Sequence, residues 1–214
     1  MDVDLYSDPS CPWCWTASQW LYAAAADRDL TVHLRLFSVA LLDKPAPPPV
    51  VLARAWSLRA MRVATALDSG PAAAFLGEFS RLLFSGEAGA DGPDLGKALA
   101  RAGKPRELAD GADEAWRDEQ IEASMRAAAE HRGLPLDRTT TVPIVVLHTD
   151  AGPVAIDGPL LDPAPAPARA AAFWDAFLLL AQEPGMYGVT RPRRGPHSTL
   201  AALTGAALIE GRMS

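Results

Sequence analysis

The chain contains two cysteines, Cys11 and Cys14, separated by two residues in the segment CPWC. Such a pair can be two buried apolar side chains, two ligands of a zinc ion, a structural disulfide, or a dithiol that is oxidised and reduced. A zinc ion needs two further ligands, and the four histidines are scattered singly along the sequence, so no metal site is predicted. The position of the pair favours a redox dithiol.

Cys11 is expected at the N-terminus of a helix. Residues 3–7 alternate between apolar and polar like a strand, and the Asp8-Pro9 pair then marks a turn. From Pro12 onward apolar residues recur at helical spacing, and proline suits the first position of a helix. Backbone N–H groups lack partners there and the helix dipole is positive, so we expect the pKa of the Cys11 thiol to fall below about 8.5.

The residues around Cys11 are expected to have different tasks. Cys14 lies one helical turn further in, where it can close a disulfide with Cys11 and resolve a mixed disulfide. Asp8 has two open interpretations, as a turn residue or as a buried carboxylate that raises the pKa of Cys14 or relays its proton. Trp13 is interpreted as a flat wall of a substrate site, and Trp15 as a core residue.

The rest of the chain predicts a β-α-β unit, a helical block, two further strands and a helix. The second strand is expected at 30–39 and the later strands at 139–149 and 152–158, joined by a hairpin turn. The predicted helices span 51–68, 71–84, 93–102, 105–115, 117–132 and 165–182. In the last of these Phe173, Phe177 and Leu180 are expected to face inward, and 198–211 could form one more helix.

Composition excludes several classes of protein. The 214 residues carry 20 basic and 26 acidic side chains with no coherent basic face, so no nucleic-acid partner is expected. No apolar run reaches the roughly 18 to 20 residues that span a bilayer. The N-terminal segment MDVDLYSDP lacks the features of an export signal, which predicts a cytoplasmic protein, and in a reducing compartment a close cysteine pair favours redox chemistry.

The sequence resembles a known family over residues 3 to about 190. The pattern YSDPxCPWCW after a first strand, a helical insertion and TVP at a later strand resemble the DsbA-like branch of the thioredoxin superfamily. Within that branch DPSCPWCWTASQW, FSVALLD, ARAW and FWDAF are most similar to the actinobacterial mycothiol-dependent reductases, also described as nitroreductases. The resemblance implies an α/β thioredoxin-like fold with an inserted all-helical domain. The expected domains are 1–45 with 136–190, the insertion 46–135, and a C-terminal tail 191–214.

The resemblance also implies roles for individual residues. Cys11 matches the nucleophilic cysteine and Cys14 the resolving one, while Pro143 matches the cis-proline that faces the active site. Pro143 could otherwise be an ordinary proline at the start of a strand. Asp43 and Val142 stand where these reductases usually have Asn and often have Thr. The substrate site is expected to comprise Pro12, Trp13, Asp43, Val142 and Pro143.

The predicted function is that of a cytoplasmic thiol-disulfide oxidoreductase without a tightly bound cofactor. The resemblance implies a low-molecular-weight thiol, mycothiol, as the reductant, with a small redoxin as the alternative, and a disulfide or a small electrophile such as a nitroaromatic as substrate. A homodimer is expected, with the apolar tail LAALTGAALI either at its interface or covering the core. The alternatives are a DsbA-type folding oxidase, a relative of kappa-class glutathione transferases or chromene-carboxylate isomerases, and a redox-switched binding protein.

Overall fold

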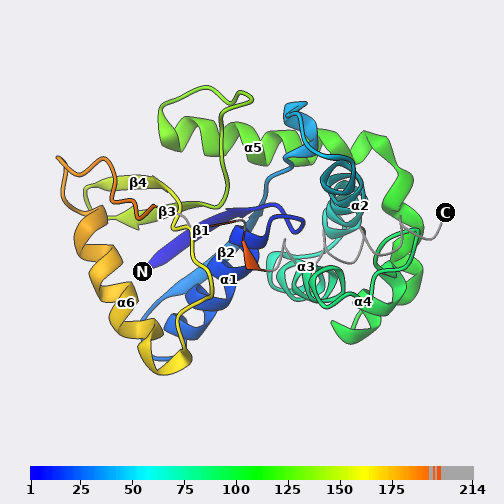
Figure 1. Cartoon of the computed structure of the whole chain (residues 1–214), viewed down its shortest axis with the longest axis horizontal. Helices are drawn as coiled ribbons and strands as arrows, with labels where there is room; N and C mark the ends of the chain where they lie inside the picture. Colours follow the sequence, from blue (N-terminus) through cyan, green and yellow to red (C-terminus); the bar gives the residue numbers. More distant parts are fainter. Residues whose placement is uncertain (193–194, 196, 199–214) are drawn as a thin grey trace.

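The computed structural model describes residues 1–192, 195 and 197–198 of the chain. The whole apolar segment LAALTGAALI, and the additional helix expected at 198–211 except for Ser198, therefore lie outside the described residues. Figure 1 shows the arrangement of the elements. The strands are β1 (Asp2–Ser7), β2 (Thr31–Leu36), β3 (Ile144–Thr149) and β4 (Gly152–Asp157). The α-helices are α1 (Pro12–Ala25), α2 (Pro48–Ala64), α3 (Ser69–Phe84), α4 (Leu95–Arg101), α5 (Asp118–Arg132) and α6 (Pro167–Ala181), with 3-10 turns at Ala40–Leu42, Arg106–Asp113 and Ala115–Arg117.

The four strands form one sheet in the order β2-β1-β3-β4. β1 and β2 run parallel with α1 as their crossover, and β3 and β4 form an antiparallel hairpin. β3 pairs antiparallel with β1, so that Tyr6 lies opposite Ile144. This register brings the end of β1, which leads to the cysteines, beside the start of β3, which follows Pro143.

Alternation along the strands gives the sheet two buried faces. Val3 and Leu5 of β1 pack with Trp20 of α1 and Trp174 of α6 on one face. The Trp20 indole is fully buried and its N–H donates to the carbonyl of Ala170, 3.1 Å away. The opposite face carries the side chains that pack against the helical insertion, among them Tyr6, Phe37, Met61, Phe75, Phe79, Ile121, Met125, Ile144 and Val146.

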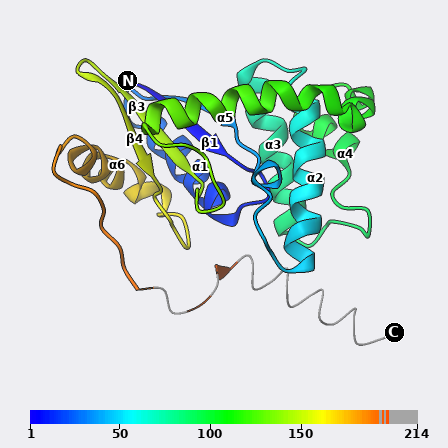
Figure 2. The same cartoon turned by 90° about the horizontal axis from the view of Figure 1, so that it is seen from above.

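The helical insertion between β2 and β3 covers this second face, as the fold prediction required. α5 contacts both β2 and β4, and Arg132 at its end pairs with Asp157 of β4 at 2.8 Å. Figure 2 shows α5 running from the sheet to the other helices of the insertion. Among the described residues, no helix combines the length and apolarity that a membrane crossing requires.

Several predicted boundaries were wrong for local reasons. β2 ends at Leu36, because the chain then turns so that the N–H of Val39 donates to the Asp8 carboxylate. β3 begins only at Ile144, because the Asp137 carboxylate accepts the N–H groups of two following residues and forms a turn there. The segment predicted as a helix at 105–115 is a 3-10 helix over Arg106–Asp113.

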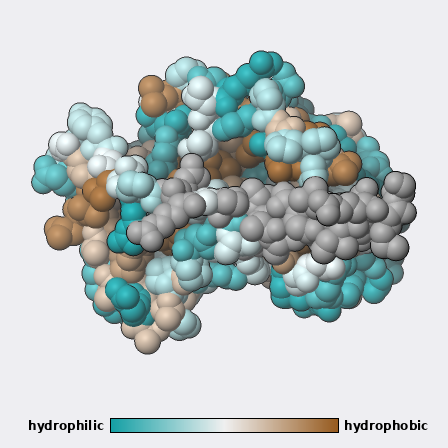
Figure 3. All heavy atoms as spheres, viewed as in Figure 1, coloured by the Kyte–Doolittle hydropathy of each residue, from teal (hydrophilic) through white to brown (hydrophobic). Residues whose placement is uncertain are grey.

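The inward face of α6 differs from the predicted one. Phe177 is buried as expected and Phe173 is partly buried, but Leu180 is 42% exposed and Trp174 occupies the core instead. Buried residues of α6 recur at steps of three and four positions through Trp174, Phe177 and Ala181, which turns Leu180 away from the sheet. Apolar side chains lie over α6 on the left of Figure 3.

Gly92 provides a test of packing within the helical insertion. Its φ is +92°, and a Cβ there would lie 2.6 Å from ring atoms of Trp56. We therefore expect Gly92→Ala to lower the free energy of unfolding by about 2 to 5 kcal/mol, through backbone strain and overpacking. Gly89 is the matched control, since it pairs with Gly92 in the same turn and has open space at its Cβ position. Urea unfolding of both variants measures the difference, and equal losses would contradict the account.

Candidate active site

The two thiols lie at the N-terminus of α1, as predicted. Cys11 is the residue that precedes the helix, with Pro12 at its first position, and the Cys11 N–H donates to the Asp8 carbonyl at 2.9 Å. The turn that begins at Asp8 thus delivers the chain from β1 into α1. Cys11 is partly exposed and Cys14 is fully buried, and both are free thiols. Cys11 is therefore the more accessible of the two residues.

The surroundings separate the two thiol pKa values. The pKa of Cys11 is lowered, first by the hydrogen bond from the Cys14 side chain and further by the backbone N–H groups of Cys14 and Trp13. The pKa of Cys14 is raised well above its ordinary value, first by burial and then by its hydrogen bond to Cys11 and the charge of Cys11. Cys11 is therefore the more acidic thiol of the pair, and Cys14 is the thiol that keeps its proton more strongly.

Asp8 is a fully buried carboxylate that joins several segments behind the thiols. It accepts hydrogen bonds from the N–H and hydroxyl of Ser10 at 2.8 and 2.7 Å, from the hydroxyl of Ser57 in α2 at 2.6 Å, and from the N–H of Val39 at 2.7 Å. Its charge raises the pKa of both cysteines. The turn role and the electrostatic role that the sequence left open thus coexist, while proton relay by Asp8 stays a prediction.

Val142 and Pro143 lie beside Cys11. The peptide bond between them is cis, and both residues are buried. The Cys11 thiol donates toward the Val142 carbonyl, with 3.7 Å between sulfur and oxygen. The pairing of β1 with β3 accounts for this proximity across more than a hundred residues of sequence. A backbone carbonyl and a reactive sulfur therefore share one wall of the site.

The structure separates Asp43 from the residues expected to accompany it. Asp43 follows the 3-10 turn Ala40–Leu42 with a φ of +47°. Its carboxylate is paired with Arg138, and its side chain is 89% exposed. Pro12 is buried and Trp13 partly buried at the start of α1, so these two stay close to the thiols. A substrate-binding role for Asp43 stays a prediction without a described contact to the cysteine pair.

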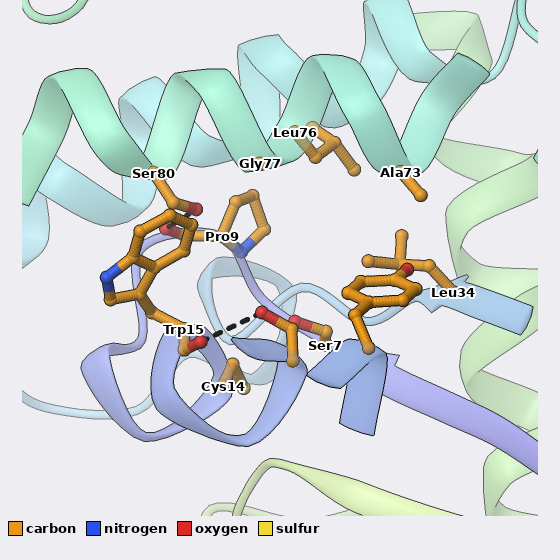
Figure 4. A pocket seen from close by; sticks show the side chains of 11 residues that line it. Ser7, Pro9, Cys14, Trp15, Leu34, Ala73, Leu76, Gly77 and Ser80 are labelled. Atoms are coloured by element: carbon orange, nitrogen blue, oxygen red, sulfur yellow. Dashed lines mark hydrogen bonds between the residues drawn. The ribbon is translucent and has the colours of Figure 1, made fainter. Parts of the chain in front are cut away.

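Trp15 lines a cavity, where the sequence predicted a core position. A groove of about 560 Å³ runs between α1 and α3, with Trp15, Tyr22 and Gly77 on its walls. A smaller recess of about 30 Å³ shares these residues and reaches Cys14, as Figure 4 shows. Space of this size accommodates a water molecule. The groove forms because α3 presents small side chains to the large aromatic ones of α1.

Two polar residues near the site had no signal in the sequence. Ser57 is fully buried in α2 and binds Asp8, although the two are far apart in the chain. His197 packs on Trp13, with ring centroids 4.4 Å apart and planes at 85°. Neither residue belongs to a motif with recognisable spacing. In the described part of the chain, no three His, Cys, Asp or Glu side chains cluster in a way that could hold a metal ion.

Comparison with known proteins assigns the family. A family model described as "Mycothiol-dependent nitroreductase Rv2466c" matches residues 10–191. The chain belongs to this Rv2466c-like family. The match contains the cysteine pair and the Val142–Pro143 bond and ends before His197. Family membership makes the chain a thiol-dependent oxidoreductase and confirms the resemblance to the mycothiol-dependent reductases that was seen in the sequence.

Solved structures share the fold of this Rv2466c-like chain. The cytosolic disulfide reductase DsbM from Pseudomonas aeruginosa is 22% identical, with a TM-score of 0.56 over 84% of this chain and 100% of that chain. The probable DsbA oxidoreductase SCO1869 from Streptomyces coelicolor is 22% identical, with a TM-score of 0.56 over 92% and 97%. A 2-hydroxychromene-2-carboxylate isomerase is 17% identical, with a TM-score of 0.54 over 88% and 100%.

Proposed function

We propose that the chain is a cytoplasmic thiol-disulfide oxidoreductase in which Cys11 and Cys14 form the redox dithiol and mycothiol is the reductant. The observation that carries the proposal is the asymmetry of the pair. Cys11 has a lowered pKa and is partly exposed beside the Val142 carbonyl, while Cys14 is buried and has a raised pKa. A nucleophile and a resolving thiol need these opposite properties.

In the proposed cycle the Cys11 thiolate attacks one sulfur of a disulfide substrate. A Cys11–substrate disulfide forms and the other substrate sulfur leaves as a thiolate. Cys14 then loses its proton and attacks the Cys11 sulfur, which forms the internal disulfide and releases the second substrate thiolate. The recess of about 30 Å³ beside Cys14 has room for a water that could accept the proton. Two small thiols then restore the dithiol and are themselves oxidised to a disulfide.

Mycothiol is proposed from family membership, and the residues around Cys11 fit a small thiol. The partly exposed sulfur of Cys11 would receive it, and the backbone of Val142 and the indole of Trp13 would flank it. The thiol supplies reducing equivalents. The cytoplasm is proposed because the neighbour DsbM is described as cytosolic and because a reduced dithiol is stable there.

A nitroaromatic is a second proposed substrate, because the family is described as nitroreductases. The dithiol would give two electrons and two protons to the nitro group. The products are a nitroso compound, water and the Cys11–Cys14 disulfide, so the reaction balances without another reductant. The same thiols would thus serve both substrate classes.

The reduction potential of the dithiol separates this proposal from a folding oxidase. Equilibration in thiol-disulfide buffers should give a reduction potential close to that of thioredoxin, about −270 mV. A potential close to that of DsbA, about −120 mV, would instead show that the protein is a folding oxidase. Turnover of one disulfide with mycothiol, glutathione or a thioredoxin in parallel identifies the reductant. The highest kcat/KM is expected with mycothiol, and efficient turnover with the thioredoxin alone would overturn that assignment.

A further inference from the structure

His197 occupies an unusual place for a residue beyond the family match. Its side chain is buried, with 2% of the residue exposed, and it lies against the Trp13 ring between the two cysteines. The centroid distance of 4.4 Å and interplanar angle of 85° describe an edge-to-face contact, the arrangement that aromatic rings favour. The active-site tryptophan is thus in contact with a segment that the family model does not include.

Leu161 and Asp162, which lie in the segment between β4 and α6, hold His197 in this place. Its Nε2–H donates to the carbonyl of Leu161 at 3.1 Å, and its Nδ1 lies 3.9 Å from the Asp162 carboxylate. The following residue, Ser198, donates its backbone N–H to the same carboxylate at 2.8 Å and its hydroxyl as well. We call Leu161, Asp162, His197 and Ser198 the C-terminal clasp.

The clasp is also tied to α1 directly. The carbonyl of Leu161 accepts a second hydrogen bond, from the Thr16 hydroxyl at 2.7 Å. Thr16 is buried in the first turns of α1, and its hydroxyl lies 3.2 Å from the carbonyl of Trp13. One carbonyl therefore links the helix that carries Trp13 with the imidazole that contacts the Trp13 ring.

We infer that His197 is a positioning residue that fixes the Trp13 indole as a rigid wall beside Cys11, and that the site thereby selects small substrates with a flat aromatic group next to the reacting atom. The inference rests on the proposed function, because it takes Trp13 to face the substrate. A fixed indole offers a ready face for stacking, whereas a mobile one must be ordered when each substrate binds.

Two disulfides of different shape test this selectivity. We use 5,5′-dithiobis(2-nitrobenzoate) as the aromatic probe and hydroxyethyl disulfide as the aliphatic one. In His197→Ala the ratio of the aromatic to the aliphatic KM should rise about two- to tenfold, the range for loss of one aromatic contact. His197→Phe keeps an aromatic ring at this position and should restore the ratio. An equal change of both KM values in His197→Ala would overturn the inference.

A second readout does not depend on turnover. Acrylamide quenching of the Trp13 emission, obtained as the difference from a Trp13→Phe protein, reports how accessible the indole is. His197→Ala should increase this quenching at least about twofold, and His197→Phe should leave it near the wild-type value. Unchanged quenching would refute the positioning role. If neither disulfide is turned over, the proposed function fails, and the quenching result still decides the contact between His197 and Trp13.

Discussion

We expect Cys11→Ser to abolish the proposed reduction of disulfides. The variant lacks the more exposed cysteine of the pair, whose pKa is lowered, whereas Cys14 is buried and its pKa is raised. Loss of a covalent nucleophile is expected to lower kcat/KM by roughly 10³-fold or more. Steady-state turnover of hydroxyethyl disulfide measures the loss.

Ser85→Ala is the matched control for this experiment. Ser85 follows α3, donates a hydrogen bond to the backbone of Leu82, and lines neither the recess beside Cys14 nor the groove. We expect kcat/KM of this variant to stay within about twofold of the wild type. Retention of more than a tenth of the wild-type turnover by Cys11→Ser would show that Cys11 is not the nucleophile.

We expect removal of Cys14 to raise the pKa of Cys11 and to arrest the proposed cycle at the mixed disulfide. The Cys14 side chain provides the strongest hydrogen bond that lowers the pKa of Cys11, so its loss lets burial and the Asp8 charge shift that pKa upward. Alkylation of the Cys11 thiolate by iodoacetamide, followed against pH, gives the midpoint. In Cys14→Ala the midpoint moves to higher pH than in the wild type, and turnover of disulfides is lost because no thiol resolves the adduct.

Cys14→Ser provides the sharper comparison. A serine hydroxyl can still donate a hydrogen bond to the Cys11 sulfur. The alkylation midpoint of Cys14→Ser should therefore lie at a lower pH than that of Cys14→Ala. Both variants should accumulate an adduct of one substrate thiol per chain, which mass spectrometry of the intact protein detects. Equal midpoints in the two variants would show that the hydrogen bond does not control the pKa of Cys11.

The first strand, the turn after it and the start of the first helix could be predicted because the sequence patterns that indicate them are local. The alternation in 3–7, the Asp8-Pro9 turn and the spacing after Pro12 each act over a few residues, and together they place the cysteines at a helix end. The fold itself was implied by the family resemblance, and the predicted order of a β-α-β unit, a helical block and a later hairpin agrees with it. The helices of the insertion were likewise predicted, apart from their ends and from the segment 105–115, which forms a 3-10 helix.

What escaped prediction depends on partners that are distant in the sequence. Ser57 binds Asp8 only because α2 lies beside the turn that follows β1, and no spacing rule links the two positions. Trp15 was assigned to the core from its apolarity, yet the small residues of α3 leave a groove beside it. Leu180 was placed inward from a helical pattern that fits two faces of α6 equally well. Tertiary packing chose between alternatives that were locally equivalent.

One contiguous set of buried side chains extends from the sheet into the helical insertion and includes Cys14 and Val142 together with Phe75 and Phe79 of α3. A hinge that swung the insertion away from the thiols would have to open this common interior and expose its apolar surface to water. The space available to a substrate is therefore set by the folded interior itself. The insertion and the redox centre should melt together in a single cooperative transition.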